Sequence, residues 1–258
     1  MDKRRIAVVT GASGGFGREF VRIFSADNNI EEIWAVSRAG DRLERLRAEF
    51  GEKVLPVVMD LTDRNSFSVL EKMLSARNVT VSVLVNNAGF AKFCSFRDIS
   101  AGESLNMIDL NVSAVVAVGL VCIPFMATGS RIMNVASQAS FFPLPYMNIY
   151  SATKAFVRNY TRALNVELGD RKITATAVCP GWMRTGLFAR GEIGAVKTVT
   201  RFAGLRNPSS VAEKAVRDAF QGRDISVCGA FTKFTHVLSK ILPQRLMMRL
   251  WLAQQGLL

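Results

Sequence analysis

Tyr150 and Lys154 lie four residues apart in the stretch YSATK, and Ser137 precedes the tyrosine by thirteen residues. Residues i and i+4 of a helix share one face, so this spacing places an ammonium group beside a phenol. A free phenol titrates near pH ~10, and a nearby positive charge lowers its pKa towards the range useful for proton exchange. A serine hydroxyl can hold the reacting oxygen. The pattern favours acid–base chemistry, although Tyr-x-x-x-Lys alone also describes an ordinary solvated helix face.

A glycine-rich turn, TGASGGFG, covers residues 10–17 directly after an apolar run. Glycine lets the backbone turn tightly and approach a pyrophosphate, and the helix that follows offers unpaired N–H groups at its N-terminus. Placement between a strand and a helix at the start of a β-α-β unit indicates a dinucleotide site. The alternative, a nucleoside triphosphate loop, is disfavoured because no Lys-Ser or Lys-Thr pair follows the glycines.

The second apolar run ends at Ser37 and Arg38. In dinucleotide-binding folds an acid at this place usually binds the ribose 2′-hydroxyl of NAD and repels a 2′-phosphate. Here Arg38 stands instead, and its fork of donors suits a phosphate. We therefore predict NADP(H) as the preferred cofactor, while Asp41, a little further on, keeps NAD(H) open.

These residues need a scaffold, and strand-like apolar runs alternate with helical patterns along the chain. The predicted strands cover residues 6–10, 33–37, 54–59, 81–85, 131–135, 173–178 and 225–228. The predicted helices cover residues 18–26, 41–50, 66–77, 106–126, 150–169 and 211–221. This alternation predicts an α/β protein with a doubly wound Rossmann fold, a mostly seven-stranded parallel sheet and helices on both faces. No linker or internal repeat is visible, so we expect one domain over residues 1–258.

The composition narrows the class of protein. The 258 residues carry a net charge of +12, but Lys and Arg are scattered among acids, so no nucleic-acid partner is expected. The four cysteines are far apart and His236 is the sole histidine, which argues against a metal site and a serine–histidine hydrolase. Residues 1–5 lack the apolar core of a signal peptide, which favours a cytoplasmic location. The uncharged segment 112–129 barely reaches a membrane span, and we interpret it as a helix buried within the protein or between subunits.

Taken together, these motifs resemble those of the short-chain dehydrogenase/reductase family, in its single-domain type. The family's Thr-Gly-x-x-x-Gly-x-Gly matches Thr10, Gly11, Gly15 and Gly17, and its Asn-Asn-Ala-Gly matches residues 86–89. Its separate asparagine, its serine and its Tyr-x-x-x-Lys match Asn111, Ser137, Tyr150 and Lys154. The match runs in the right order over roughly residues 5 to 190.

The resemblance implies a role for each matched residue. Tyr150 would be the general acid for carbonyl reduction or the base for alcohol oxidation, and Ser137 would bind the substrate oxygen. Lys154 would bind the nicotinamide ribose and lower the tyrosine pKa, and Asn111 would hold a water through its main chain. The residues implied to contact the cofactor are Gly11, Ser13, Gly15, Phe16, Gly17, Ser37, Arg38, Asp60, Leu61, Asn87, Ala88, Gly89, Tyr150, Lys154, Pro180, Gly181 and Thr185. Simpler roles stay open: Asn87 and Asn111 as ties between segments, and Asp60 as the start of a turn.

The implied activity is hydride transfer between a nicotinamide cofactor and a ketone or secondary alcohol. Candidate cleft residues are mostly apolar: Phe90, Ala91, Phe93, Phe141, Phe142, Pro143, Leu144, Met147, Trp182, Phe188 and Phe202. They favour NADPH-dependent reduction of an apolar carbonyl, such as a ketosteroid or a 3-oxoacyl compound, unless they simply form core. The alternative is a dinucleotide-binding regulatory or interaction protein without turnover.

Two regions depart from the regular pattern. Residues 183–207 are irregular and are predicted to form a loop over the substrate. The tail, residues 231–258, is apolar with only positive charges. Either it covers the cleft or a partner subunit, or it is a peripheral membrane helix, since Lys233, Lys240, Arg245 and Arg249 face no acids and Trp251 suits an interface. The helices near 112–126 and 150–168 suit a homodimer, as in the family.

Overall fold

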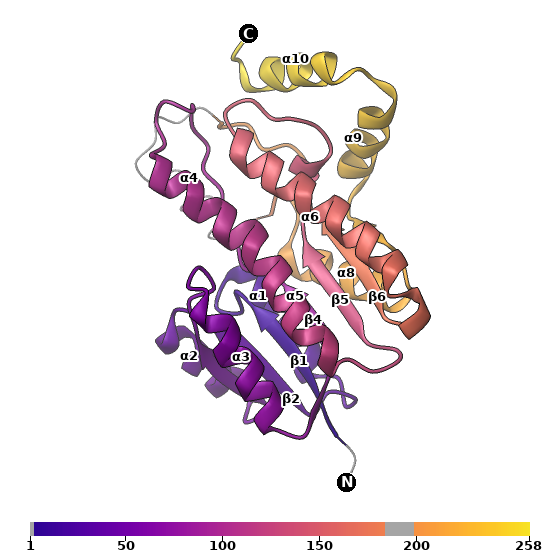
Figure 1. The fold of residues 1–258 in the computed structure, drawn as a ribbon. Helices are drawn as coiled ribbons and strands as arrows, with labels where there is room; N and C mark the ends of the chain where they lie inside the picture. Colours follow the sequence, from indigo (N-terminus) through magenta and orange to yellow (C-terminus); the bar gives the residue numbers. More distant parts are fainter. Residues whose placement is uncertain (1–2, 184–198) are drawn as a thin grey trace.

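The computed structural model describes residues 3–183 and 199–258, and these contain a single parallel sheet (Figure 1). Its strands run in the order β3-β2-β1-β4-β5-β6-β7, and every neighbouring pair is parallel. The bounds are β1 (Arg4–Thr10), β2 (Glu32–Ser37), β3 (Val54–Val58), β4 (Val79–Asn86), β5 (Arg131–Val135), β6 (Thr174–Cys179) and β7 (Ile225–Val227). The predicted doubly wound, seven-stranded fold is confirmed. The strand order reverses between β1 and β4, the place where such sheets open a crevice at their carboxyl ends.

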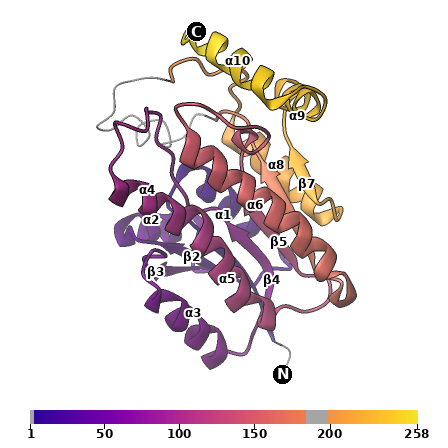
Figure 2. The same ribbon diagram turned by 45° about the horizontal axis from the view of Figure 1, so that its top comes forward.

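Helices cover both faces of the sheet, as Figure 2 shows. One face carries α1 (Gly15–Ser25), α2 (Gly40–Phe50) and α8 (Pro208–Phe220), and the other carries α3 (Asn65–Ala76), α5 (Ala114–Cys122) and α6 (Asn148–Glu167). Successive side chains of a strand point to opposite faces of the sheet, so each strand packs against both layers of helices. In β1, Ala7 and Val9 pack with the first group, whereas Ile6 and Val8 pack with the second. A short turn, η4 (Gly169–Arg171), then leads from α6 to β6.

The apolar helix predicted from residue 106 begins earlier and is interrupted. It consists of α4 (Ala101–Ile108), a π turn η1 (Asp109–Ser113), α5 and a 3-10 turn η2 (Ile123–Phe125). By length and composition alone the span Ala101–Phe125 is apolar enough to cross a membrane, and 39% of its apolar window is buried. Its residues Ala114, Val118 and Cys122 pack into the core beneath the sheet. This packing agrees with a core helix.

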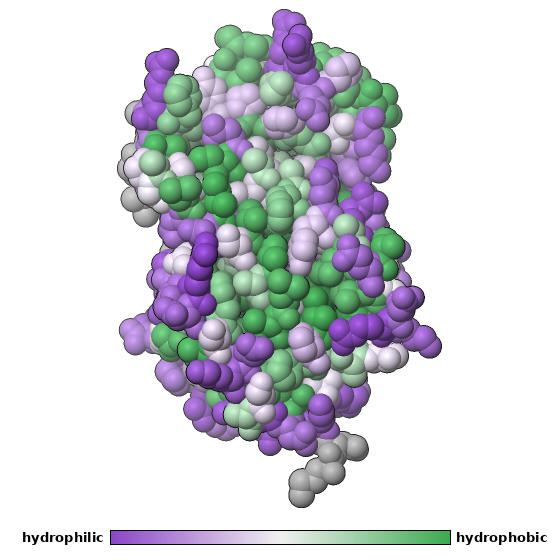
Figure 3. Space-filling view, in the orientation of Figure 1, coloured by the Kyte–Doolittle hydropathy of each residue, from purple (hydrophilic) through white to green (hydrophobic). Residues whose placement is uncertain are grey.

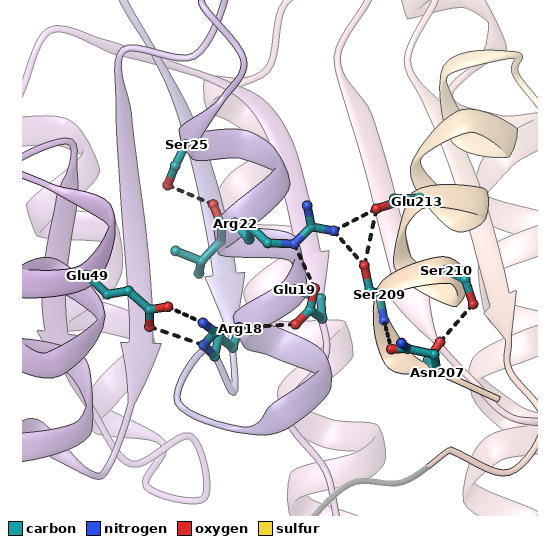
Figure 4. Close-up of polar contacts among 10 residues, drawn as sticks. Arg18, Glu19, Arg22, Ser25, Glu49, Asn207, Ser209, Ser210 and Glu213 are labelled. Atoms are coloured by element: carbon teal, nitrogen blue, oxygen red, sulfur yellow. Dashed lines mark hydrogen bonds and ion pairs between the residues drawn. The ribbon is translucent and has the colours of Figure 1, made fainter. Parts of the chain in front are cut away.

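Charged side chains connect α1 to the helices on either side of it (Figure 4). Arg18 forms an ion pair with Glu49 of α2, and Arg22 lies 2.8 Å from Glu213 of α8. Exposed pairs of this kind contribute about 0–1 kcal/mol each, so they add little stability. They help to hold α1 in place between α2 and α8, and α1 carries the glycine turn at its N-terminus.

The tail forms two helices rather than one, α9 (Ala230–Ile241) and α10 (Gln244–Gln255). The break falls at Pro243, which has no N–H to donate and which disfavours helical backbone in the residue before it. Leu242 is accordingly extended, with ψ at 144°. Figure 1 shows both helices at the end of the molecule that lies beyond the carboxyl edge of the sheet.

Candidate functional site

A cavity of about 550 Å³ opens at the carboxyl ends of the strands, where the strand order reverses. Nearly all of the predicted site residues line it: Gly11, Ser13, Gly15, Phe16, Gly17, Ser37, Arg38, Asp60, Leu61, Asn87, Ala88, Gly89, Ser137, Tyr150, Lys154, Pro180 and Gly181. Asn111 is not among the lining residues. Thr185 lies outside the described residues, as does most of the predicted substrate loop.

The glycine turn has the close backbone contacts that its sequence predicts. Gly11 has a φ of +64°, in the left-handed region that favours glycine. A Cβ on Gly17 would lie 2.2 Å from the carbonyl oxygen of Gly11. The amide of Asn87 donates to the carbonyls of Thr10 and Gly11, both at 3.1 Å, which fixes the turn against β4.

Replacing Gly17 by Ala tests this packing. The added methyl group overlaps backbone that cannot move without displacing α1, so we expect a loss of about 1–3 kcal/mol in unfolding free energy and at least about tenfold weaker dinucleotide binding. Chemical denaturation and NADPH fluorescence titration measure the two effects. The control is Gly102→Ala in α4, where a Cβ meets nothing within 4 Å and stability should rise slightly. Equal behaviour of the two variants would contradict the close approach at Gly17.

The end of the cavity beside the carboxyl end of β2, where the sequence predicts the cofactor's ribose and which we call the ribose end, combines hydroxyl groups with cations. Ser13 Oγ and Ser37 Oγ lie 2.6 Å apart, and Arg38 lies 3.5 Å from the carboxylate of Asp60. Burial opposes ionisation of Asp60, but hydrogen bonds from Thr62 and the charge of Arg38 bring the pKa of its carboxyl below the usual value. Asp60 thus starts a turn, as the simpler interpretation has it, and also lines the cavity.

Sequence reasoning missed one cation, Arg42, which lines the same end of the cavity. It lies in the first turn of α2, four residues after Arg38. The signal was available as the spacing Arg-x-x-x-Arg, but it has no motif of its own. Two guanidinium groups at the ribose end make this region strongly favourable for a phosphate.

Helix α6 places Tyr150 and Lys154 on one face, at the cavity, as their spacing predicts. They are only 6% and 4% exposed. The Nζ atom of Lys154 lies 5.9 Å from the tyrosine ring centre and donates to the carbonyl of Val135 at 2.7 Å. Ser137 follows β5 and caps the short helix η3 (Gln138–Ser140) by accepting from the Ala139 N–H. Both its hydroxyl and the Tyr150 side chain lie at the cavity.

Burial dominates the ionisation of both groups. It raises the pKa of the Tyr150 phenol, and the hydrogen bond with Ser137 opposes this shift. It lowers the pKa of Lys154 to about 8. In the protein alone the Tyr150 pKa therefore lies above its usual value, because burial disfavours the phenolate. The lowering by Lys154 stays a prediction. At neutral pH Tyr150 holds its proton and Lys154 is mostly charged.

Asn111 is fully buried within the π turn, and its amide ties two segments together. Its Oδ1 accepts from the Phe90 N–H at 3.0 Å, and its Nδ2 donates to the Phe90 carbonyl and to Thr153. The side chain is thus a tie, as the simpler interpretation allowed. A role in the reaction would have to come from its main chain.

Some of the apolar cleft candidates are packed in the core, and others line the cavity. Phe93, Trp182 and Phe202 pack edge to face or tilted, with ring centres 4.8–6.0 Å apart. Together with Tyr150 they belong to one cluster that also holds Phe90, Ala91, Phe142, Leu144 and Met147. Of these candidates only Phe90 and Trp182 line the cavity. Phe141 stacks on His236 and Pro143 is exposed, and neither lines the cavity, while Phe188 lies outside the described residues.

The cavity suits a dinucleotide better than a metal. A Cβ on Gly11 or Gly17 would collide with neighbouring atoms, so the turn keeps its backbone free of side chains there, and Arg38 and Arg42 supply cations to the lining. No group of three metal-ligating side chains occurs within residues 3–183 and 199–258. The nearby Cys179 is inert, because burial raises the pKa of its thiol to about 11.

Comparison with known proteins gives one consistent result. A family model described as short chain dehydrogenase matches residues 5–194. An NADP-dependent 3-hydroxy acid dehydrogenase, YdfG, of Salmonella typhi is 34% identical over 179 residues, which are 68% of this chain and 71% of the relative. An uncharacterized short-chain type dehydrogenase/reductase of Sinorhizobium fredii is 30% identical over 83% of this chain, but the chain spans only 40% of that relative. A solved short-chain dehydrogenase from Sphingobium yanoikuyae, in complex with NADPH, superposes with a TM-score of 0.74 at 27% identity and covers 98% of this chain and 94% of its own.

Proposed function

Because the chain belongs to the short-chain dehydrogenase/reductase family, we propose that it interconverts a ketone and a secondary alcohol with a nicotinamide cofactor. The observation that carries this proposal is that Ser137, Tyr150 and Lys154 all line one cavity, with the Lys154 ammonium 5.9 Å from the tyrosine ring centre. When bound, the cofactor supplies or accepts the hydride. The other roles in the reaction fall to residues of this chain.

The roles follow from the positions of these side chains. In reduction Tyr150 donates its phenolic proton to the carbonyl oxygen, and in oxidation it accepts the proton from the alcohol. Ser137 holds that oxygen by a hydrogen bond. Lys154 places a positive charge at the cavity, where it binds ribose hydroxyls and stabilises the phenolate that the transfer leaves. A positioned acid–base group of this kind contributes about 10²–10⁴-fold in rate. Asn111 acts through its main chain, where the π turn interrupts the regular helical hydrogen bonds.

The preferred cofactor is NADP(H). Arg38 and Arg42 both line the ribose end of the cavity, where NAD-specific folds carry an acid that repels phosphate. One relative is named as NADP-dependent and one structural neighbour binds NADPH, which supports the same choice. NAD(H) remains a second cofactor, since Asp41 lies in the first turn of α2, next to Arg42.

The proposed substrate is an apolar carbonyl compound, a ketosteroid or a 3-oxoacyl-like ketone. Phe90, Trp182 and Met183 line the cavity, and the cluster around Tyr150 is apolar throughout. The name of one relative, a 3-hydroxy acid dehydrogenase, supports the 3-oxoacyl class. Reduction is the direction that the NADPH preference favours.

A steady-state screen tests the proposal. Purified protein is assayed against a panel of ketosteroids, 3-oxoacyl thioesters, small aldehydes and charged oxo acids, with NADPH and NADH in parallel. We expect turnover of the apolar ketones, with kcat/KM at least about tenfold higher for NADPH. A strong preference for small, highly charged carbonyls would contradict the substrate class. Binding of NADPH without turnover of any carbonyl would instead support the regulatory alternative.

The assembly and location are also proposals. We propose a homodimer through α5 and α6, because Leu120, Phe156 and Val166 are 62%, 44% and 78% exposed on these helices. In Figure 3 a hydrophobic surface extends over this part of the molecule. A monomer at micromolar concentration by light scattering would contradict the dimer.

We propose a cytoplasmic location with peripheral contact to a membrane, which cell fractionation checks.

A further inference from the structure

Helix α9 packs in the reverse of the usual sense, with polar side chains inward. Thr232 is 2% exposed, and a Cβ on Gly181 would lie 2.5 Å from its hydroxyl. His236, one turn further on, stacks on Phe141 with ring centres 4.4 Å apart. Small and polar side chains therefore make the contacts between the inner face of α9 and the rest of the protein.

The outer face carries the large apolar side chains. Phe231, Phe234, Val237 and Ile241 are 42%, 63%, 55% and 72% exposed. Their spacing of three, three and four residues places them along one side of the helix, and we call this set the α9 stripe. Single exposed apolar residues are ordinary, but a continuous stripe on a helix indicates a surface that something covers.

The second tail helix packs on the body of the protein and also carries exposed apolar side chains. Met247, Trp251 and Gln255 of α10 face inward, and the Trp251 indole donates to the Pro145 carbonyl at 3.0 Å. The expectation that Trp251 lies at an interface is therefore wrong, because it packs in the cluster around Tyr150. Outward, Leu246 and Leu250 are 40% and 47% exposed. Figure 3 shows hydrophobic residues among hydrophilic ones at this end of the molecule.

The charge around the stripe is of one sign. Residues 229–258 contain no Asp or Glu, while Lys233, Lys240, Arg245 and Arg249 are all exposed. Lys233 and Lys240 are seven residues apart and so lie on the same flank of the stripe. The charges that act on His236 from α9 and α6 are also positive, from Lys240, Arg158 and Arg162.

From this arrangement we infer that α9 docks on an anionic lipid surface. The α9 stripe enters the boundary between headgroups and acyl chains, and the flanking lysines contact lipid phosphates. A second copy of the chain fits less well. A two-fold contact would bring two such sets of cations together, in a protein whose net charge is already +12. Because α10 packs on the cluster around Tyr150, docking places the substrate side of the cavity next to the membrane.

Vesicle flotation with the full-length protein tests the inference. Vesicles of phosphatidylcholine with 30–40% phosphatidylglycerol, roughly the charge density of an anionic membrane, are compared with pure phosphatidylcholine. We expect binding to the anionic vesicles that weakens with salt. Phe234→Gln with Ile241→Gln should weaken it at least about tenfold, since two large apolar groups stay in water. Lys233→Gln with Lys240→Gln should weaken it by roughly tenfold and remove part of the salt dependence.

The matched control is Val58→Gln with Val69→Gln, which changes two valines that are 64% and 50% exposed elsewhere on the protein. This variant should bind vesicles like the unaltered protein. Failure of the unaltered protein to float with anionic vesicles would overturn the inference. So would a Phe234→Gln, Ile241→Gln variant that still floats but forms a smaller oligomer by light scattering, which would identify a second copy as the occupant.

Discussion

Tyr150→Phe is expected to lower kcat for carbonyl reduction by about 10²–10⁴-fold and to leave NADPH affinity within about twofold of the unaltered protein. The substitution removes only the phenolic oxygen, while the ring keeps its place in the apolar cluster that it shares with Trp182 and Trp251. The proton donor is lost and the dinucleotide contacts stay. Steady-state assays with a turned-over ketone measure the first effect, and NADPH fluorescence titration measures the second.

The matched control is Tyr160→Phe, which removes one hydroxyl from the same helix. The Tyr160 hydroxyl lies 3.6 Å from the Cβ position of Gly119, on the side of α6 that faces α5, and it does not line the cavity. Its loss should leave kcat unchanged. Retention of more than about a tenth of the activity in Tyr150→Phe would remove Tyr150 from the role of proton donor. A parallel loss of NADPH binding would point to damage of the site instead.

The second large effect is expected from Arg38→Ala combined with Arg42→Ala. A hydrogen bond to a charged group contributes about 1.5–3 kcal/mol, and each 1.4 kcal/mol corresponds to tenfold in affinity. The double variant should therefore lose at least about 100-fold in kcat/KM with NADPH. With NADH, which lacks the phosphate, the change should stay within about threefold. Asp60, freed of its partner at 3.5 Å, adds a negative charge that further disfavours the phosphate.

Arg45→Ala serves as the control for this pair. It removes the same charge from the same helix, but Arg45 is exposed and does not line the cavity. Its kcat/KM with NADPH should be unchanged. Equal losses with NADPH and NADH in the double variant would mean that the arginines support the fold rather than read the phosphate. No loss with NADPH would refute the cofactor preference.

The sheet and the cofactor turn were predictable because local pattern and long-range packing agree there. The strands are buried on both faces, so their apolar runs stand out, and β5 was predicted to the residue at 131–135. Gly11 and Gly17 could be placed because only glycine tolerates their backbone angle or close contact. The role of such a residue can be predicted from its type alone, because glycine has no side chain.

Other features depend on contacts that sequence spacing does not encode. Arg42 reaches the cavity because α2 begins only three residues after the end of β2, so its first turn lies at the carboxyl edge of the sheet. Burial of Tyr150 and Lys154 sets the direction of their pKa shifts, and burial is a property of the assembled cluster. The tail was recognisably amphipathic, yet the pattern alone cannot say that Trp251 turns inward and Phe234 outward.

Helix α10 packs near the proposed substrate region but does not contribute to the lining of the dinucleotide cavity. Among the residues that the structure describes, those that line the dinucleotide cavity all fall within 11–183. Helix α10 is joined to the body by hydrogen bonds such as Trp251 to Pro145 and Gln255 to Arg201. A different last helix could be grafted onto the same body and reshape the chamber above Tyr150, while the hydride-transfer machinery beneath stayed as it is. In such a modular design, substrate specificity changes by exchange of the last helix, without any change in the residues that line the dinucleotide cavity.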